Sequence, residues 1–230
     1  MDYSSTQNIS QIISSLSHEL RTPITILSSN LQLLKNNDLK LDEEMRTETF
    51  QLCEEALKSV TSFLDGIHFL NLANKKELKR KDTPINLNLF IEKILNNRNT
   101  LFYKSDRIKV MIDQEKTDFC TDELLLSKIL TNLIENAYKF SAKDVLLTIT
   151  NNSNFLDINI EDQGVGIPED KLHSIFLPFF RCENVKMLSG TGLGLPIAQK
   201  ATDCLGGEIT ITSTILKGTK VKLKIPSNEC

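Results

Sequence analysis

Residues 9–34 read ISQIISSLSHELRTPITILSSNLQLL and carry an apolar side chain at every third or fourth position. That spacing is typical of one face of a long amphipathic helix. The turn signal Asn36-Asn37-Asp38 follows, and a second apolar stripe begins at Phe50. The two stripes consist of Ile9, Ile13, Leu16, Leu20, Ile24, Leu27, Leu31 and Leu34, and then of Phe50, Cys53, Leu57, Val60, Leu64 and Ile67. The pattern predicts two long helices joined by a short turn.

A single helical hairpin cannot bury both stripes, so it would leave apolar surface in contact with water. The second stripe also has the alternating steps of three and four residues that are typical of a heptad seam. Pairing of two hairpins into a four-helix bundle would cover this surface. We therefore expect the first part of the chain to be an all-α helical hairpin that forms a homodimer.

The character of the chain changes after the second stripe. Residues 74–82 are rich in charged side chains and precede Pro84, which is typical of an interdomain linker. Farther on, the sequence predicts helices at 89–97 and 124–140, the second with Asp122 as its N-cap, and strands at 108–112, 145–150, 155–161, 208–214 and 219–225. We expect three parts: a hairpin at 1–76, a linker at 77–84 and an α+β sandwich at 85–228.

The amino-acid composition and net charge exclude several classes of protein function. The 230 residues include 27 Lys and Arg against 30 Asp and Glu, so the net charge is −3. This balance argues against a nucleic-acid-binding protein, which usually has a basic surface. No apolar run reaches the ~18 residues that span a bilayer, and the first residues lack the pattern of a signal peptide. The five widely spaced cysteines indicate neither a disulfide framework nor a zinc site, which favours a reducing cytoplasm.

His18 is the first candidate catalytic residue. It lies about 200° round the predicted helix from Leu16, away from the apolar stripe. Pro23, one turn farther on, would remove a helical hydrogen bond at a cost of ~3 kcal/mol, and such a cost is more often found at functional sites. A neutral imidazole is a nucleophile near pH 7, and Glu19 could accept its Nδ1 proton so that Nε2 is free to attack. The alternative is a solvated surface histidine.

The segment around His18 resembles a known family. Residues 17–25, SHELRTPIT, resemble the H box of bacterial sensor histidine kinases of the HisKA type. The resemblance implies that His18 is phosphorylated by ATP and passes the phosphoryl group to an aspartate on the receiver domain of a response regulator. In that family the pattern E-x-x-T after the histidine marks kinases that also dephosphorylate their regulator, which implies a phosphatase role for Thr22.

A second segment carries carboxamides at helical spacing. Asn132 and Asn136 lie four residues apart on one predicted helix face, and Lys139 follows one turn later. Carboxamide oxygens suit Mg²⁺, and a lysine meets a phosphate as a point charge. The segment 132–140, NLIENAYKF, resembles the N box of the family's GHKL-type ATP-binding catalytic domain. This implies ATP and Mg²⁺ as cofactors, with Asn136 as a metal ligand and Asn132 as a second one.

Two glycine-rich segments complete the resemblance. Residues 162–167, DQGVGI, and 190–195, GTGLGL, resemble the G1 and G2 boxes, in which glycines let the backbone approach the ligand. The resemblance implies that Asp162 binds the adenine amino group and that Thr219 lies near the adenine. The implied ATP-binding residues are Asn132, Asn136, Lys139, Asp162, Gly164, Gly166, Gly190, Gly192, Gly194 and Thr219.

Three further features bear on the family resemblance. The lid between Arg181 and Gly190 is short, and Lys186 is the only cation between those two residues. Related gyrase-like ATPases have a water-activating Glu at the position of Asn132, so its absence favours transfer to His18 over hydrolysis. Residues 175–181, IFLPFFR, resemble the F box, which either packs internally or docks on the hairpin.

Two other functions are consistent with parts of this sequence. One is a nucleotide-binding scaffold of the same fold with weak or no catalysis, and the other is a gyrase-like ATPase. We expect the chain to be cytoplasmic, either by itself or as the cytoplasmic part of a membrane-anchored sensor. Contact with a membrane would then be made only by segments that this chain does not contain.

Overall fold

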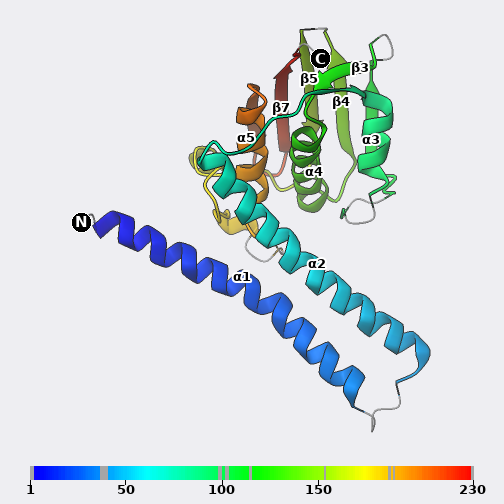
Figure 1. Ribbon diagram of the computed structural model, residues 1–230, viewed down its shortest axis with the longest axis vertical. Helices are drawn as coiled ribbons and strands as arrows, with labels where there is room; N and C mark the ends of the chain where they lie inside the picture. Colours follow the sequence, from blue (N-terminus) through cyan, green and yellow to red (C-terminus); the bar gives the residue numbers. More distant parts are fainter. Residues whose placement is uncertain are drawn as a thin grey trace. The chain divides into compact units, whose positions relative to one another are not determined.

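The computed structural model describes residues 3–36, 41–97, 100–101, 104–113, 116–152, 154–185, 188 and 190–228, with the backbone alone for 3–15 and 18. The chain forms two compact units, residues 1–68 and 69–230. Figure 1 shows the elements of both units.

The first unit contains the helical hairpin that the apolar stripes predict. Helix α1 spans Tyr3–Lys35 and contains Pro23, and helix α2 spans Glu43–Asn74 and continues into the second unit. Asp42 begins α2, because its Oδ1 accepts a hydrogen bond from the Met45 amide at 2.8 Å. Of the predicted turn at 36–38, only Asn36 lies within the described residues.

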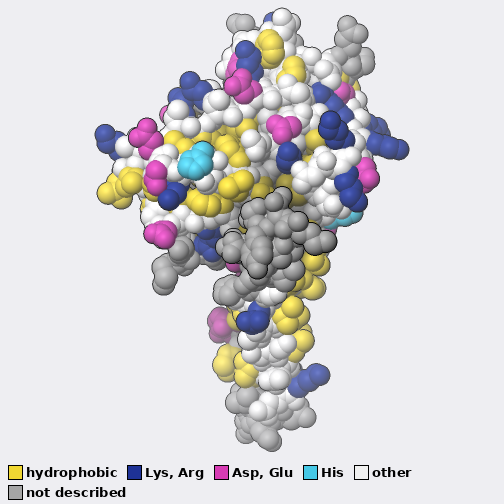
Figure 2. Space-filling model, turned by 90° about the vertical axis from the view of Figure 1, so that its left-hand side faces the viewer, with side chains coloured by type: hydrophobic (Ala, Val, Ile, Leu, Met, Phe, Trp, Pro, Cys, Tyr) yellow, Lys and Arg dark blue, Asp and Glu magenta, His cyan; other side chains and the backbone are white. Residues whose placement is uncertain are grey.

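Part of the predicted apolar seam remains at the surface of the single chain. The side chains of Phe50, Leu57 and Leu64 are 57%, 56% and 51% exposed, and Ile24 on α1 is 49% exposed. Hydrophobic side chains are accordingly visible along the hairpin in the space-filling view (Figure 2). Exposure at heptad spacing is what a helix surface shows when its partner helices come from another chain.

The second unit is built on a five-stranded sheet in the order β2-β4-β5-β7-β6. Its strands are β2 (Ile108–Ile112), β4 (Val145–Asn151), β5 (Phe155–Glu161), β6 (Glu208–Thr214) and β7 (Gly218–Pro226). The β2–β4 pair is parallel and the other pairs are antiparallel. The five predicted strands are thus confirmed to within a residue or two.

Helices α3 (Leu87–Leu95), α4 (Glu123–Phe140) and α5 (Gly194–Cys204) cover one face of this sheet (Figure 1). Every second side chain of β4 and β5 is buried beneath these helices. On α4, the side chains of Ile129, Leu130 and Leu133 are buried as well. The α+β sandwich is therefore confirmed, and its core lies between α4 and the sheet. No helix in the described part of the chain is long and apolar enough to cross a membrane.

Two short strands and the disulfide-bonded Cys120 depart from the sequence prediction. Strand β1 (Thr83–Asn86) pairs antiparallel with β3 (Asp118–Thr121), and neither was predicted. Strand β1 begins inside the predicted linker 77–84. Pro84 is tolerated in it because a two-stranded sheet needs few backbone N–H donors for its hydrogen bonds. Cys53, Cys182 and Cys204 are free thiols, whereas Cys120 is disulfide-bonded.

Candidate active site

Helix α4 presents the predicted N-box residues to the G2 segment. Asp122 caps the helix, and its Oδ1 accepts a hydrogen bond from the Leu125 amide at 3.0 Å. A methyl group built on Gly194 would lie 3.1 Å from Asn132 Oδ1 and 3.5 Å from Asn136 Nδ2. These two carboxamides therefore lie directly against the first residue of α5.

The amide group of Asn132 is oriented by its own helix. Its Nδ2 donates to the carbonyl oxygen of Lys128 at 2.7 Å, so Oδ1 is the atom that faces Gly194. A carbonyl-type oxygen is the donor atom that Mg²⁺ prefers. The described residues contain no cluster of three or more His, Cys, Asp or Glu that could hold a metal ion. The carboxamide oxygens of Asn132 and Asn136 are of the ligand type that suits the expected Mg²⁺.

Lys139 lies one turn after Asn136 and reaches the beginning of the G2 segment. A methyl group built on Gly190 would collide with Lys139 Nζ, so the end of this lysine side chain lies directly against the glycine. The ammonium also lies 5.1 Å from the centre of the Phe140 ring. The structure therefore brings Lys139, Gly190 and Gly194 together with the two asparagines.

Asp162 follows β5 and is held in place by backbone groups. Its Oδ1 accepts a hydrogen bond from the Gly164 amide at 2.7 Å, and its own amide donates to the Thr219 carbonyl at 2.9 Å. Burial raises the pKa of Asp162 and outweighs the opposing backbone hydrogen bonds. Asp162, Gly164 and Thr219 thus form one cluster at the end of the sheet. A partly buried carboxyl group whose orientation is fixed by a backbone amide suits recognition of a hydrogen-bond donor such as an exocyclic amino group.

Ser213 supports this cluster, although the sequence analysis did not single it out. Its hydroxyl oxygen accepts a hydrogen bond from the Ile167 amide at 2.8 Å and lies 2.9 Å from Thr219 Oγ1. Gly166, also predicted, lies against Thr214 on the same strand. Serine and threonine are common in β6, so nothing in the sequence distinguished Ser213 from its neighbours.

The F-box and G2 segments are joined through their backbones. Phe179 and Gly192 both have positive φ angles, of 66° and 69°, and the Phe179 amide donates to the Gly192 carbonyl at 3.1 Å. Arg181 Nη2 donates to the Val185 carbonyl at 2.9 Å and also to the Leu188 carbonyl. Arg181 thus holds lid backbone, while Lys186 lies outside the described residues.

The candidate phosphoacceptor residues lie in the other unit, on α1. The backbone of His18 is helical, and its side chain lies outside the described residues. Glu19 is half-buried and Thr22 is exposed, whereas Pro23 is buried. The predicted catalytic residues therefore share one helix, while the predicted nucleotide residues share the second unit.

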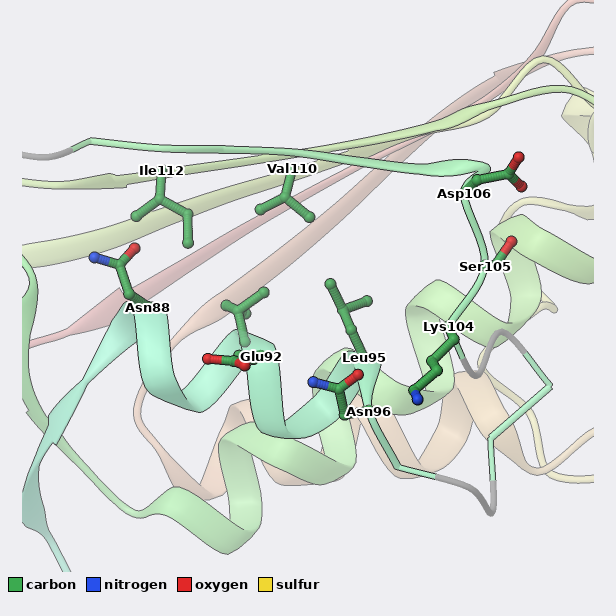
Figure 3. A pocket seen from close by; sticks show the side chains of 10 residues that line it. Asn88, Glu92, Leu95, Asn96, Lys104, Ser105, Asp106, Val110 and Ile112 are labelled. Carbon is green, nitrogen blue, oxygen red and sulfur yellow. The ribbon is translucent and has the colours of Figure 1, made fainter.

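A separate cavity of about 440 Å³ opens between α3 and β2 (Figure 3). Val110 and Ile112 of β2 point toward α3 and face Leu95, and the polar lining residues include Glu92 and Lys104. None of the predicted site residues lines it. It is therefore not part of the candidate active site.

Comparison with known proteins agrees with this geometry. Residues 121–229 match the family described as "Histidine kinase-, DNA gyrase B-, and HSP90-like ATPase", and residues 8–71 match "His Kinase A (phospho-acceptor) domain". Sensor protein kinase WalK of Staphylococcus aureus is 29% identical over 227 residues, which cover 94% of this chain and 53% of that sequence. The chain thus spans about half the length of this relative, and 36% of WalK from strain JH9.

Solved structures give the same result. Histidine kinase AdeS of Acinetobacter baumannii has a TM-score of 0.66 and 26% identity, with 92% of this chain and 98% of that chain covered. The fold is also similar to that of histidine kinase ThkA in a complex with the response regulator protein TrrA. That likeness has a TM-score of 0.62 and 20% identity, and it covers 98% of this chain and 64% of that chain.

Proposed function

Because the chain belongs to the sensor histidine kinases, we propose that it transfers the γ-phosphoryl group of ATP to His18 and then to an aspartate on a response-regulator receiver domain. The observation that carries this proposal is the cluster of Asn132, Asn136 and Lys139 against the glycines of the G2 segment. Carboxamide oxygens, an ammonium group and close-lying backbone are a donor set for a metal-bound polyphosphate. ATP binding itself follows from the family of the second unit.

Asp162 and Thr219 are proposed to receive the adenine. The carboxyl group accepts a hydrogen bond from the exocyclic amino group, and Gly164 and Gly166 leave room for the base. Gly190, Gly192 and Gly194 form the loop that surrounds the phosphates at the N-terminus of α5, where backbone amides favour negative charge. This assignment agrees with the positions of the two glycine segments at the ends of α4 and α5.

Mg²⁺ is the cofactor that Asn136, together with Asn132, is proposed to hold. When bound, it offsets the negative charge that develops on the transferred phosphoryl group. Lys139 adds a positive charge beside the same phosphates. No carboxylate replaces Asn132 on this face of α4, so the site lacks a base that would activate water. This supports transfer to a protein nucleophile over hydrolysis of ATP.

His18 is proposed to be that nucleophile. Its Nε2 attacks the γ-phosphorus, the bond to the β–γ bridging oxygen breaks, and ADP leaves with that electron pair. Glu19 accepts the Nδ1 proton, which leaves a neutral phosphoimidazole. Thr22 is proposed to act in the opposite direction, by orienting a water molecule toward the aspartyl phosphate of the regulator.

The active protein is proposed to be a homodimer that works with a receiver domain. The exposed seam at Phe50, Leu57 and Leu64 supports pairing of two hairpins into a four-helix bundle. The proposed division is a dimerisation and phosphotransfer hairpin at 1–76, a linker at 77–84 and a catalytic domain at 85–228. We place these parts in the cytoplasm, where receiver domains occur.

Incubation with radiolabelled ATP followed by acid or base treatment tests the proposal. A protein histidine kinase labels itself, and the label is lost in acid and kept in base. A nucleotide-binding scaffold incorporates no label, and a gyrase-like ATPase releases phosphate without labelling itself. Either of the last two results would overturn the proposed function.

A further inference from the structure

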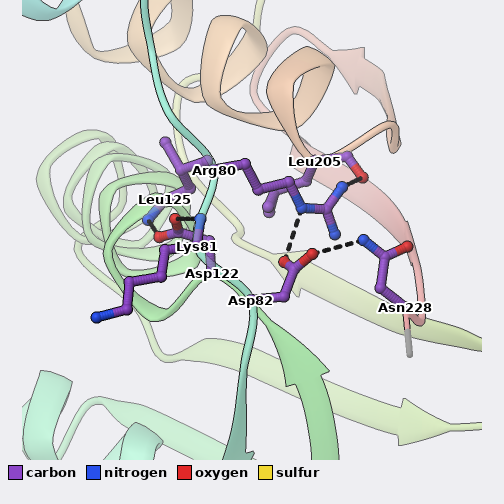
Figure 4. Close-up of polar contacts among 7 residues, drawn as sticks. All are labelled: Arg80, Lys81, Asp82, Asp122, Leu125, Leu205 and Asn228. Carbon is purple, nitrogen blue, oxygen red and sulfur yellow. Dashed lines mark hydrogen bonds and ion pairs between the residues drawn. The ribbon is translucent and has the colours of Figure 1, made fainter. Parts of the chain in front are cut away.

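The segment that follows α2 lies within the second unit and is bonded to other parts of that unit at several points. Helix α2 ends in a Schellman-type turn, in which the Glu77 amide donates to the Leu72 carbonyl at 2.9 Å and Lys76 has a φ of 57°. At Arg80 and Lys81 the chain then forms hydrogen bonds with residues far away in the sequence (Figure 4). The charged residues of this stretch predict only an interdomain linker at 77–84.

Asp122 takes part in two different structures at once. Its Oδ1 caps α4 through the Leu125 amide at 3.0 Å, and its Oδ2 accepts a hydrogen bond from the Lys81 amide at 2.7 Å. Asp122 is only 6% exposed. One buried carboxylate therefore joins the incoming segment to the first turn of the helix that carries Asn132 and Asn136 (Figure 4).

Arg80 makes the equivalent connection to α5. Its Nη1 donates to the carbonyl oxygen of Leu205, the C-cap of α5, at 2.7 Å, and its Nε pairs with Asp82 Oδ1 at 2.7 Å. Asn228 donates to the other oxygen of Asp82 at 2.6 Å. Burial alone would raise the pKa of Asp82, but hydrogen bonds from Asn228 and Arg80 and the charge of Arg80 lower it below its ordinary value. The aspartate is therefore ionised, and holds Arg80, at neutral pH.

These bonds lie at the ends of α4 and α5 that are remote from the nucleotide residues. Asn132 lies nine residues beyond the start of α4, or about 14 Å along its axis, and Leu205 is separated from Gly194 by a similar length. The two helices pack against each other. A displacement of residues 80–82 would therefore act on both helices through rigid, hydrogen-bonded turns.

We propose that Asp122 is a positioning residue for phosphotransfer, because it fastens the segment arriving from the histidine hairpin to the helix that carries the metal-binding asparagines. Residues 80–82 then move with the ATP-binding domain as one body. The effect on transfer to His18 rests on the proposed function, whereas the bond itself does not.

Asp122→Asn separates the two roles of this residue. Asparagine is as good an N-cap as aspartate, so the Leu125 bond is kept, but its Nδ2 presents a donor to the Lys81 amide. In the full chain we expect residue-level amide exchange to rise at least tenfold at Lys81 and to stay unchanged at Leu125. The Kd for ATP should change less than twofold. The rate of His18 phosphorylation at saturating ATP should fall at least fivefold.

Glu123→Gln is the matched control. It removes a carboxylate from the same helical turn and breaks only the exposed ion pair with Lys93, so none of these quantities should change. Arg80→Ala is a second variant, which loses the Leu205 and Asp82 bonds and leaves Asp122 intact. Arg80→Ala should give the same fall in phosphorylation rate with an unchanged Kd for ATP, even if Asp122→Asn does not fold.

The outcomes distinguish this inference from the proposed function. Unchanged exchange at Lys81 in Asp122→Asn, or a freed Lys81 amide with an unchanged phosphorylation rate, would overturn the positioning role alone. Loss of thermal stability with no change in rate in either variant would assign these residues a purely structural role and would also overturn it. A wild-type chain that forms no phosphohistidine would overturn the proposed function, while amide exchange would still report the bond.

Discussion

The carbonyl oxygen of Phe140 accepts a hydrogen bond from the Val165 amide at 3.2 Å, which joins the last turn of α4 to the loop after β5. Gly164 lies against the same carbonyl group, so that a methyl group there would collide with it. The proposed metal-binding residues of α4 and the proposed adenine-binding loop are therefore held together by backbone contacts.

Gly164→Ala tests this close approach. The added methyl group would also lie 2.9 Å from Asp162 Oδ1, so the loop or the end of α4 must shift. We expect ATP binding to weaken at least tenfold by calorimetry. Gly206→Ala is the control, because Gly206 has a φ of 70° but its nearest neighbour, Pro226, is 3.8 Å away. That variant should lose about 1 kcal/mol of stability and keep its affinity for ATP. Equal affinities for the two variants would contradict the argument.

Asp162→Asn should affect stability and binding in opposite directions. Burial raises the pKa of Asp162 above its ordinary value of 3.8, so the ionised carboxylate destabilises the nucleotide-free fold at neutral pH. The variant should therefore unfold at a higher temperature at pH 7. That gain should shrink as the pH falls through the raised pKa and vanish below 3.8, where the carboxyl is protonated in both folded and unfolded chains.

The same variant should bind ATP more weakly by about 1–3 kcal/mol, because asparagine can present a donor where the adenine amino group needs an acceptor. Asp144→Asn, at an exposed position in the turn after α4, is the control for loss of charge. Calorimetry and thermal unfolding at several pH values measure both effects. Unchanged ATP affinity would remove Asp162 from the adenine site.

Asn136→Ala should separate magnesium-dependent turnover from nucleotide binding. Loss of the carboxamide oxygen removes a proposed metal ligand but leaves Asp162 and Thr219 to hold the base. We expect the Mg²⁺-dependent phosphorylation rate to fall at least a hundredfold, with a much smaller change in ATP affinity without the metal. Asn71→Ala, at an exposed helical asparagine, should change neither. An equal loss of affinity with and without Mg²⁺ would argue against a metal-ligand role.

Much of this architecture is readable from the sequence because its signals are local. The steps of three and four residues predict both helices of the hairpin, and Asp122 before an apolar run predicts the start of α4. Strands β1 and β3 were missed because each has four residues, too few to show an alternating pattern. Contacts such as that between Arg80 and Leu205 join residues 125 positions apart, and no local pattern encodes them.

The candidate site likewise contains features that the sequence predicts and features that only the structure shows. Its boxes are recognisable because several residue types recur at fixed spacing, as in residues 132–140. Ser213 and the carbonyl of Phe140 were not predictable, because a serine in a strand rich in Ser and Thr is unremarkable and a backbone carbonyl has no sequence signature. The orientation of Asn132, set by its bond to Lys128, likewise required the structure.

Thr22→Ala should affect dephosphorylation of the regulator and spare autophosphorylation. Thr22 is exposed on α1, one turn after His18 and about 40° round the helix, so the two positions share a face. We expect decay of a phosphorylated cognate regulator to slow at least tenfold with the variant. Thr25→Ala, exposed on the same helix, should leave the decay unchanged. A threonine that only bonds a backbone carbonyl near Pro23 would leave both activities as they are.

The most direct test of the account is the stoichiometry of acid-labile, base-stable phosphate on wild type and His18→Gln after incubation with Mg-ATP. His18 and the proposed nucleotide-binding residues lie in different units, so the variant should bind ATP with unchanged affinity and acquire no phosphate. His68→Gln, exposed on α2, should label like wild type. Acid-labile phosphate on His18→Gln at the wild-type level would contradict the assignment of His18 as the phosphoacceptor.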